Sequence, residues 1–244
     1  MIVLHSHYCH RSALYREYKR QTGSTLSEKS FNRYLVRWLK EGEIYSAGRN
    51  WYSDLQDEFK LFTRPLTELN DFLAEAFPLL EFVCWSTKQL TNFYHNLPGK
   101  FYTFIYVSRY SMRDVAAQIQ KKYPEFAILL HPGKNDLIDF LPRNNNIVIR
   151  PLIYDDRKYA PEDSFLQIEN ILVDLAIEAD ALSLMDVTEY SGILNNIAVS
   201  GRIKPGVILR RISRRKVKSR YIAALLKYFQ AEQENQSMSI KIIS

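Results

Sequence analysis

Basic side chains recur at helical spacing between residues 29 and 40. Lys29, Arg33, Arg37 and Lys40 follow one another at steps of four, four and three residues, which places them with Asn32 on one face of a helix. Cationic side chains that project from one helix face can reach DNA phosphates and guanine edges. For the helix taken alone, a solvated charged surface is the alternative interpretation. The segment is therefore a candidate nucleic-acid-binding surface.

An amphipathic helix is needed to position these side chains. The other face of residues 26–41 carries apolar residues at core spacing. They are Phe31, Tyr34, Leu35, Trp38 and Leu39. A shorter basic helix over residues 11–20 ends near Gly23, with its apolar residues on one side. Two helices joined in this way predict a helix-turn-helix.

Two short β-like runs follow the second helix, at residues 43–46 and 50–53, and residues 47–49 join them. This pattern predicts a hairpin wing with Arg49 at its tip, where an arginine is suited to the minor groove or its phosphates. The whole segment is therefore predicted to be a winged helix-turn-helix that binds double-stranded DNA. Its predicted contact residues are Lys29, Asn32, Arg33, Arg37, Lys40 and Arg49.

The start of the chain is short for a winged helix, which usually has a further helix before its first strand. We therefore expect the native gene to begin upstream, at an in-frame start with its own ribosome-binding site. Residues 5–10 also contain metal-ligand types, namely His5, His7, Cys9 and His10. Strand alternation would turn His10 to the opposite face, and no second ligand pair follows at finger spacing, so we expect no metal site.

The net charge of +6 hides an uneven distribution. Residues 1–53 carry nine Lys/Arg and four Asp/Glu, residues 54–201 carry thirteen and twenty-one, and residues 202–220 carry nine and none. Cations clustered at two places in the chain favour contact with phosphate. The second cluster, which we call the basic run, has as its candidate residues Lys204, Arg210, Arg211, Arg214, Arg215 and Lys218.

Length and composition indicate a folded protein of two domains. A chain of 244 residues, 46% hydrophobic and 25% charged, exceeds the usual size of one compact domain. We expect a winged helix at 1–55, a packed connecting segment at 56–77 and a second domain at 78–244. The two cysteines do not suggest a disulfide framework, and no segment has the length of a membrane span. We therefore expect a cytoplasmic protein that contacts no membrane.

Strands and helices alternate in the second predicted domain. Strands are predicted at residues 79–85, 101–107, 126–131 and 146–152, with helices at 86–96 and 112–122. Further helices are predicted at residues 167–180, 187–199, 205–214 and 217–233. The fold class is therefore mixed α/β: an N-terminal winged helix-turn-helix, then an α/β domain with a central mixed sheet and a helical C-terminal part.

Catalytic signatures are absent from this domain. Glycine is scarce, and no phosphate loop, zinc-hydrolase motif or nucleophile elbow occurs. A metal-dependent nuclease would need paired carboxylates on adjacent strands, whereas Glu81 stands alone. Tyr102, Phe104 and Tyr106 alternate and could stack bases, but core packing is the commoner role, as it is for Cys84. We expect no catalytic residues, no cofactor and no enzyme activity.

Several segments resemble the AbiEi-like antitoxins of type IV toxin–antitoxin systems. They follow the predicted winged helix in the sequence and are residues 80–90 (LEFVCWSTKQL), 98–107 (PGKFYTFIYV), 147–152 (IVIRPL), 168–175 (IENILVDL) and 209–215 (LRRISRR). The resemblance implies that the N-terminal domain represses its own operon by binding inverted repeats. It also implies that the C-terminal domain counters a nucleotidyltransferase toxin encoded next door.

Three classes of function therefore compete. The first is a DNA-binding antitoxin, as a monomer or as a dimer assembled on DNA. The second is a winged-helix transcriptional regulator that responds to a small ligand and has no toxin partner, and the third is a nuclease with degenerate motifs. Under the first, the basic run could extend the DNA footprint, or it could face an acidic toxin surface or the RNA that the toxin modifies.

Overall fold

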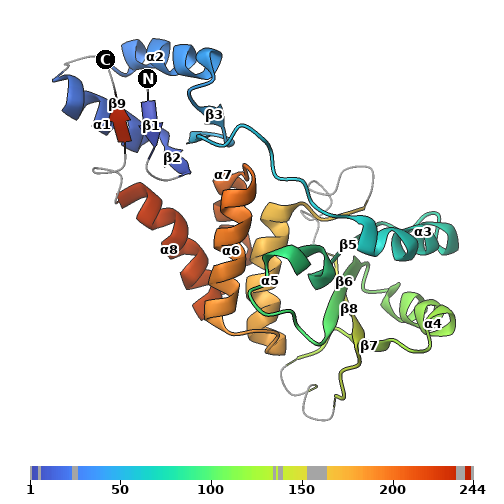
Figure 1. Ribbon diagram of the computed structural model, residues 1–244. Coiled ribbons are helices and arrows are strands. Elements are labelled where there is room, and N and C mark those ends of the chain that lie inside the picture. The colour runs from blue at the N-terminus through green and yellow to red at the C-terminus, as the bar shows by residue number, and fades with distance from the viewer. Residues whose placement is uncertain are drawn as a thin grey trace. The chain divides into compact units, whose positions relative to one another are not determined.

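The chain forms two compact units in the computed structural model (Figure 1). The first unit comprises residues 1–60, 172–177 and 194–244, and the second comprises residues 61–171 and 178–193. Helices α5 (Ile168–Leu182) and α6 (Val187–Ser200) contribute residues to both. The residues that the structure describes are 2–4, 7–23, 27–133, 136, 140–152, 164–234 and 240–242.

The first unit contains the elements of a winged helix-turn-helix. Strand β2 (Tyr8–His10) leads into helix α1 (Arg11–Thr22), and helix α2 (Glu28–Glu41) follows. Strands β3 (Tyr45–Ser46) and β4 (Trp51–Ser53) form the hairpin, and the three strands make an antiparallel sheet in the order β2-β4-β3. Both helices and the hairpin lie close to their predicted positions.

Local chemistry explains where these helices begin and end. Gly23 and Gly42 end α1 and α2 in the left-handed conformation, at φ 61° and 71°, which glycine adopts at little cost. At the start of α2 the Ser27 side chain accepts a hydrogen bond from the Ser30 N–H at 3.3 Å. The core between the helices contains Leu14, Tyr18, Phe31, Leu35 and Trp38. Burial of this stripe leaves the opposite face of α2 in solvent.

Elements from the other end of the chain complete the first unit. They are helices α7 (Pro205–Arg215) and α8 (Arg220–Glu234) and strand β9 (Ile240–Ile242), which pairs with β1 (Ile2–Leu4). The sequence pattern predicts α7 and α8 as part of the second domain at 78–244, whereas in the structure they belong to the first unit. Helical periodicity shows which face of a helix is apolar, but not which sheet that face covers.

Tyr8 and Phe229 show how α8 is held on the small sheet. The Phe229 ring packs edge-on against the rings of Tyr8 and Trp51, at centroid distances of 6.3 and 6.1 Å. The Tyr8 hydroxyl lies 3.0 and 3.1 Å from the carbonyl oxygens of Ala198 and Gly201, to which it donates. Both aromatic side chains are buried, so α8 is part of the core of this unit.

A four-stranded mixed sheet forms the centre of the second unit. Its strands are β5 (Phe82–Ser86), β6 (Phe101–Val107), β7 (Ala127–Leu130) and β8 (Asn145–Pro151), in the order β5-β6-β8-β7. Strands β6, β8 and β7 are parallel, and β5 is antiparallel to β6. The predicted mixed sheet and the mixed α/β fold class are therefore confirmed.

One face of this sheet packs against helices α3 (Thr67–Ala76) and α4 (Met112–Lys122), and against the 3₁₀ turn η1 (Arg64–Leu66) (Figure 1). The shared core includes Leu69, Leu73, Val115, Ile119, Cys84, Ile105, Ile147 and Ile149. Leu66, Leu69 and Leu73 of the predicted connecting segment are thus buried, whereas Phe62 is exposed. From residue 61 onward the segment belongs to the second unit.

The helix after β5 is shorter than the sequence predicts and is of the 3₁₀ type. A helix was expected over residues 86–96, whereas the structure has the 3₁₀ helix η2 (Thr87–Phe93). Ser86 and Gln89 form a reciprocal capping box at its start, in which the Ser86 N–H donates to Gln89 Oε1 at 2.9 Å. The tight 3₁₀ turn is geometrically poorer than an α-helix and seldom continues for long.

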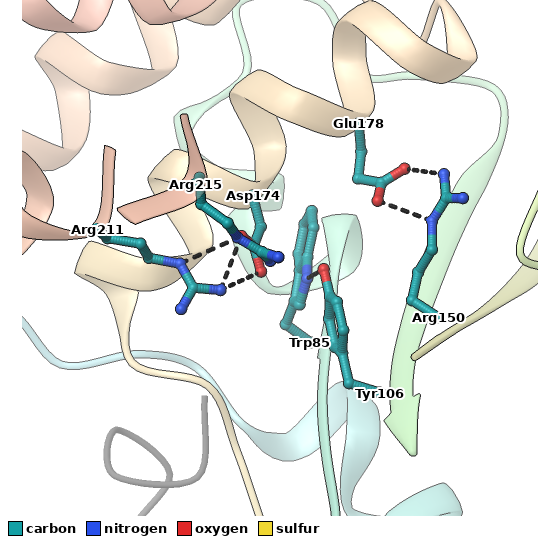
Figure 2. A network of polar contacts seen from close by, with 7 residues as sticks. All are labelled: Trp85, Tyr106, Arg150, Asp174, Glu178, Arg211 and Arg215. Atoms are coloured by element: carbon teal, nitrogen blue, oxygen red, sulfur yellow. Dashed lines mark hydrogen bonds and ion pairs between the residues drawn. The ribbon is translucent and has the colours of Figure 1, made fainter. Parts of the chain in front are cut away.

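The other face of the sheet carries aromatic residues. Trp85 and Phe104 stack with a centroid distance of 4.4 Å and an interplanar angle of 14°. Trp85 Nε1 donates to the Tyr106 hydroxyl at 3.4 Å (Figure 2). Phe104 and Tyr106 are buried and Tyr102 is half-buried, which agrees with the core role predicted for this alternating run.

In the described part of the chain, no helix combines the length and the apolar character needed to cross a bilayer.

Candidate nucleic-acid interface

The solvent-facing side of α2 carries the residues that were predicted to contact DNA from this helix. All five are exposed: Lys29, Asn32, Arg33, Arg37 and Lys40. Val36 lies among them and is 64% exposed. Since the opposite stripe is fixed in the core, the cationic side chains are held on the outside of the unit.

Arg11, at the start of α1, joins this surface and was missed in the sequence. Its guanidinium group donates to Glu28 Oε1 and to Asn32 Oδ1, both at 2.8 Å. These contacts fix the start of α2 against α1 and orient the Asn32 amide. Its oxygen accepts from Arg11, and its NH₂ group is the end that can donate to a partner. The signal in the sequence was a basic residue at the first position of α1, which carries no partner information by itself.

The charges along α2 differ in how they are engaged. Arg37 Nε donates to Glu41 Oε2 at 3.2 Å in an exposed pair one turn apart. Such pairs contribute little to stability and compete poorly with a phosphate. Within the described residues, Lys29, Arg33 and Lys40 take part in no ion pair. They are the cations of this face that are available to an anionic partner.

The hairpin turn lies against the segment that begins α7. Gly48, at φ 94°, lies just before Arg49 in the turn, and the Arg49 side chain is exposed. A methyl group placed on Gly48 would come within 3.5 Å of Lys204 Cβ, and one on Gly206 would come within 3.7 Å of the Arg49 carbonyl oxygen. The first unit therefore brings the predicted wing next to the start of the basic run, two features that the sequence treated separately.

The basic run divides into buried and exposed residues. Arg211 and Arg215 both bind the carboxylate of Asp174, on α5 (Figure 2). Arg211 Nη2 lies 2.8 and 2.7 Å from the two carboxylate oxygens, and Arg215 Nη2 lies 2.9 Å from one of them. Because Asp174 and Arg211 are almost completely buried, these two arginines form an internal ion-pair network and lie outside the surface patch predicted from the sequence.

The protonation of Asp174 is set by two opposing effects. Burial disfavours the charged carboxylate, but the guanidinium groups of Arg211 and Arg215 outweigh it, and the pKa of Asp174 is lowered. The carboxylate is therefore charged at neutral pH, and both arginines share its single negative charge.

The remaining candidates of the basic run face solvent to different degrees. Arg210 and Arg214, one turn apart on α7, are exposed, as is Lys218 beyond the helix. Lys204 is half-buried beside the hairpin turn. A cationic surface thus remains, smaller than the sequence suggested.

The histidine and cysteine residues near the start have separate surroundings. Cys9 is buried in the core, and His10 Nδ1 accepts from the Ser12 N–H at 3.3 Å as the cap of α1. His7 Nδ1 lies 2.9 Å from Asp54 Oδ1. His5 lies outside the described residues, and among those that are described no three metal-ligand side chains gather.

The second unit contains an ion pair that sequence reasoning missed. Arg150, on β8, donates from Nε and Nη2 to the two carboxylate oxygens of Glu178 at 2.9 and 2.6 Å (Figure 2). Both side chains are largely buried. The available signal was the pair of acids Asp174 and Glu178, four residues apart on one face of the mainly apolar helix α5.

Glu81 and Cys84, which the sequence raised as candidates for catalysis, have different surroundings. Glu81 is exposed just before the strand begins, whereas Cys84 is completely buried in the sheet core. Burial raises the pKa of the Cys84 thiol to about 12, which is the opposite of what a nucleophile needs.

The fold and the surface define a class of protein with a helix-turn-helix and hairpin in one unit and a mixed α/β sheet in the other. The chain belongs to the family described as "Family of unknown function (DUF6577)", whose model matches residues 30–231. The match begins within α2 and ends within α8, so it includes residues of both units. No curated protein matches the sequence.

Proposed function

We propose that this protein is a sequence-specific DNA-binding repressor that reads its operator through α2. The observation that carries the proposal is the exposed cationic face of α2, with Lys29, Arg33 and Lys40 available and Asn32 oriented by Arg11. The apolar stripe anchors α2 to the unit, and its opposite face is left exposed, which is the arrangement that a helix needs to contact bases in the major groove.

The DNA footprint in this proposal extends from α2 to the hairpin and α7. Arg49 is exposed in the turn, and the half-buried Lys204 lies beside that turn. Arg210 and Arg214 continue the cationic surface along α7. Arg211 and Arg215 take no part, because their guanidinium groups bind the Asp174 carboxylate inside the unit.

We further propose that repression serves a type IV toxin–antitoxin operon in the cytoplasm, in which this protein counters a nucleotidyltransferase toxin. The support is the resemblance of residues 80–90, 98–107, 147–152 and 168–175 to AbiEi-like antitoxins. In the structure the first three segments contribute to β5, β6 and β8 of the sheet, and the fourth begins α5.

DNA binding is tested with the purified protein and the promoter of its own operon. A mobility shift at low salt is expected, where phosphate contacts are strongest, and it should weaken steeply as salt is raised. The footprint should cover inverted repeats. Equal affinity for an unrelated duplex of the same length, or no shift at low salt, would overturn the repressor proposal.

The antitoxin role needs a separate test. A neighbouring gene for a nucleotidyltransferase is expected, and co-expression of this protein should restore growth to cells that express that gene. A variant with Arg33→Ala and Arg37→Ala should lose repression and retain neutralisation. Failure to restore growth by a folded, expressed protein would reject the antitoxin role and leave the repressor role standing.

A ligand-responsive regulator is the second candidate function. The observation that favours it is a pocket of about 740 Å³ in the second unit, at the edge of the sheet where β6 and β8 end. An operator affinity that changes when a small ligand fills this pocket, in an operon without a toxin gene, would favour this candidate over the antitoxin.

A further inference from the structure

The pocket in the second unit lies at the carboxyl ends of two parallel strands. Ser108 directly follows β6, and Pro151 ends β8; both line a cavity of about 740 Å³. Loops at this edge of a parallel α/β sheet converge on the place where such sheets ordinarily bind ligands. Fold position and cavity size therefore both fit a small organic molecule.

One side of the pocket is suited to an acidic group. Ser108, Arg109 and Ser111 line it, and α4 begins at the next residue, so the positive end of that helix faces the same loop. Arg109 is exposed and makes no ion pair within the described residues. Glu81 also lines the pocket; it precedes Phe82, the partner of Val107, and therefore lies near Ser108 rather than near the start of α4.

Two further basic side chains lie near this edge of the sheet. Arg150 lies near the end of β8, and His131 directly follows β7. The pKa of His131 is lowered, first by burial and then by the charges of Arg150 and Arg109. Arg150 is bound to Glu178, so among the described residues of this edge Arg109 is the cation with no carboxylate partner.

The other side of the pocket carries exposed apolar side chains. Leu79 is 98% exposed and Tyr110 is 96% exposed, and both line the cavity together with Leu152. Large apolar side chains grouped around a cavity are typical of a binding surface. A hydrocarbon or aromatic group would remove them from water.

We propose that this pocket binds a small organic anion, with its phosphate or carboxylate group at Arg109 and the adjacent serines and its apolar part against Leu79 and Tyr110. Binding at this pocket does not require DNA on the first unit. It would give the second unit a ligand whether or not the protein has a toxin partner.

Calorimetric titration of the full chain with phenyl phosphate, benzoate and inorganic phosphate tests the site. At least one aromatic anion should bind saturably and more tightly than inorganic phosphate. Arg109→Ala should weaken that binding about tenfold, the loss expected for one charge-assisted hydrogen bond. Leu79→Ala should weaken binding of the aromatic anion and leave that of inorganic phosphate unchanged. A preference for phenyl phosphate or for benzoate distinguishes a phosphorylated from a carboxylate ligand.

Lys121→Ala, at the far end of α4, is the matched control and should bind as the wild type does. Thermal melting of each variant establishes that it is folded. Absence of saturable binding by either aromatic anion up to about 10 mM, or equal binding by wild type and Arg109→Ala, would overturn the proposal.

Discussion

Arg211 and Asp174 form a bidentate ion pair in the interior of the first unit. Arg211 Nη2 lies 2.7 and 2.8 Å from the two carboxylate oxygens, and the side chains are 5% and 1% exposed. Arg215 adds a third contact at 2.9 Å. Because Arg211 and Asp174 are almost completely buried, removal of the carboxylate costs both arginines an ion pair that water cannot readily replace.

Asp174→Asn should therefore destabilise the protein strongly. We expect a loss of about 3–5 kcal/mol in the free energy of unfolding, the range for breaking a buried ion pair from one side. Urea denaturation followed by circular dichroism measures it. Asp71→Asn, at an exposed position on α3, is the control and should change the stability by less than about 0.5 kcal/mol. Similar midpoints for the two variants would contradict the structural role of Asp174.

Acid should destabilise the wild type more than Asp174→Asn. The pKa of Asp174 is lowered from its ordinary value of 3.8, so its contribution to stability is fully present above that value and is lost as the pH falls toward the folded pKa. Urea midpoints measured from about pH 5 down to about pH 2.5 should fall more steeply for the wild type. Parallel curves for the two proteins would show that Asp174 has the same pKa folded and unfolded.

Arg33→Ala should weaken operator binding without loss of stability. Arg33 is exposed on α2 and has no ion pair within the described part of the chain, so its removal leaves no buried charge. If Arg33 contacts a phosphate, the slope of log affinity against log salt should fall by about 1. Fluorescence anisotropy over a salt series measures this slope. Arg113→Ala, on α4 of the second unit, should keep the wild-type value.

Arg210 and Arg214 are the exposed arginines of α7, where charge reversal tests DNA binding without disturbing the core. Arg210→Glu with Arg214→Glu should lower the affinity for DNA and preserve the fold, because both side chains face solvent. The corresponding change at Arg211 and Arg215 should unfold the protein by placing acids against Asp174. Binding by anisotropy and melting by circular dichroism separate the two effects. Unchanged DNA affinity in the exposed pair would remove α7 from the footprint.

The two cysteines should be unreactive in the folded protein. Cys9 and Cys84 are buried, and burial raises the pKa of Cys84 to about 12, so almost no thiolate exists at neutral pH. Titration with a chromogenic disulfide reagent at pH 8 should release colour only after denaturant is added. Rapid reaction of one thiol in the native protein would contradict the burial of that residue.

Local patterns in the sequence were enough to predict the helix-turn-helix. Residues close together in the chain specify the apolar stripe of α2, the glycines after α1 and α2, and the hairpin turn. The exposed positions of Lys29, Arg33 and Lys40 follow from the same stripe, because burying one face of a helix exposes the opposite one. The alternation of strands and helices likewise predicted the mixed sheet.

The basic run shows where that reasoning stops. Helical spacing separates Arg210 and Arg214 from Arg211 and Arg215, but it does not say which pair faces solvent. Asp174 decides this, since it lies on a different helix within the first unit and attracts the second pair. The choice depends on a contact between residues 37 positions apart, as the Arg211 bonds show.

The sequence by itself determined the periodic elements, the cationic face of α2 and the strands of the sheet, because these depend on neighbours along the chain. Only the tertiary structure decided that α8 packs on β2, that the wing meets Lys204 and that Arg150 binds Glu178. Each of these is a long-range contact, selected by the fit of whole surfaces and by the need to compensate buried charge.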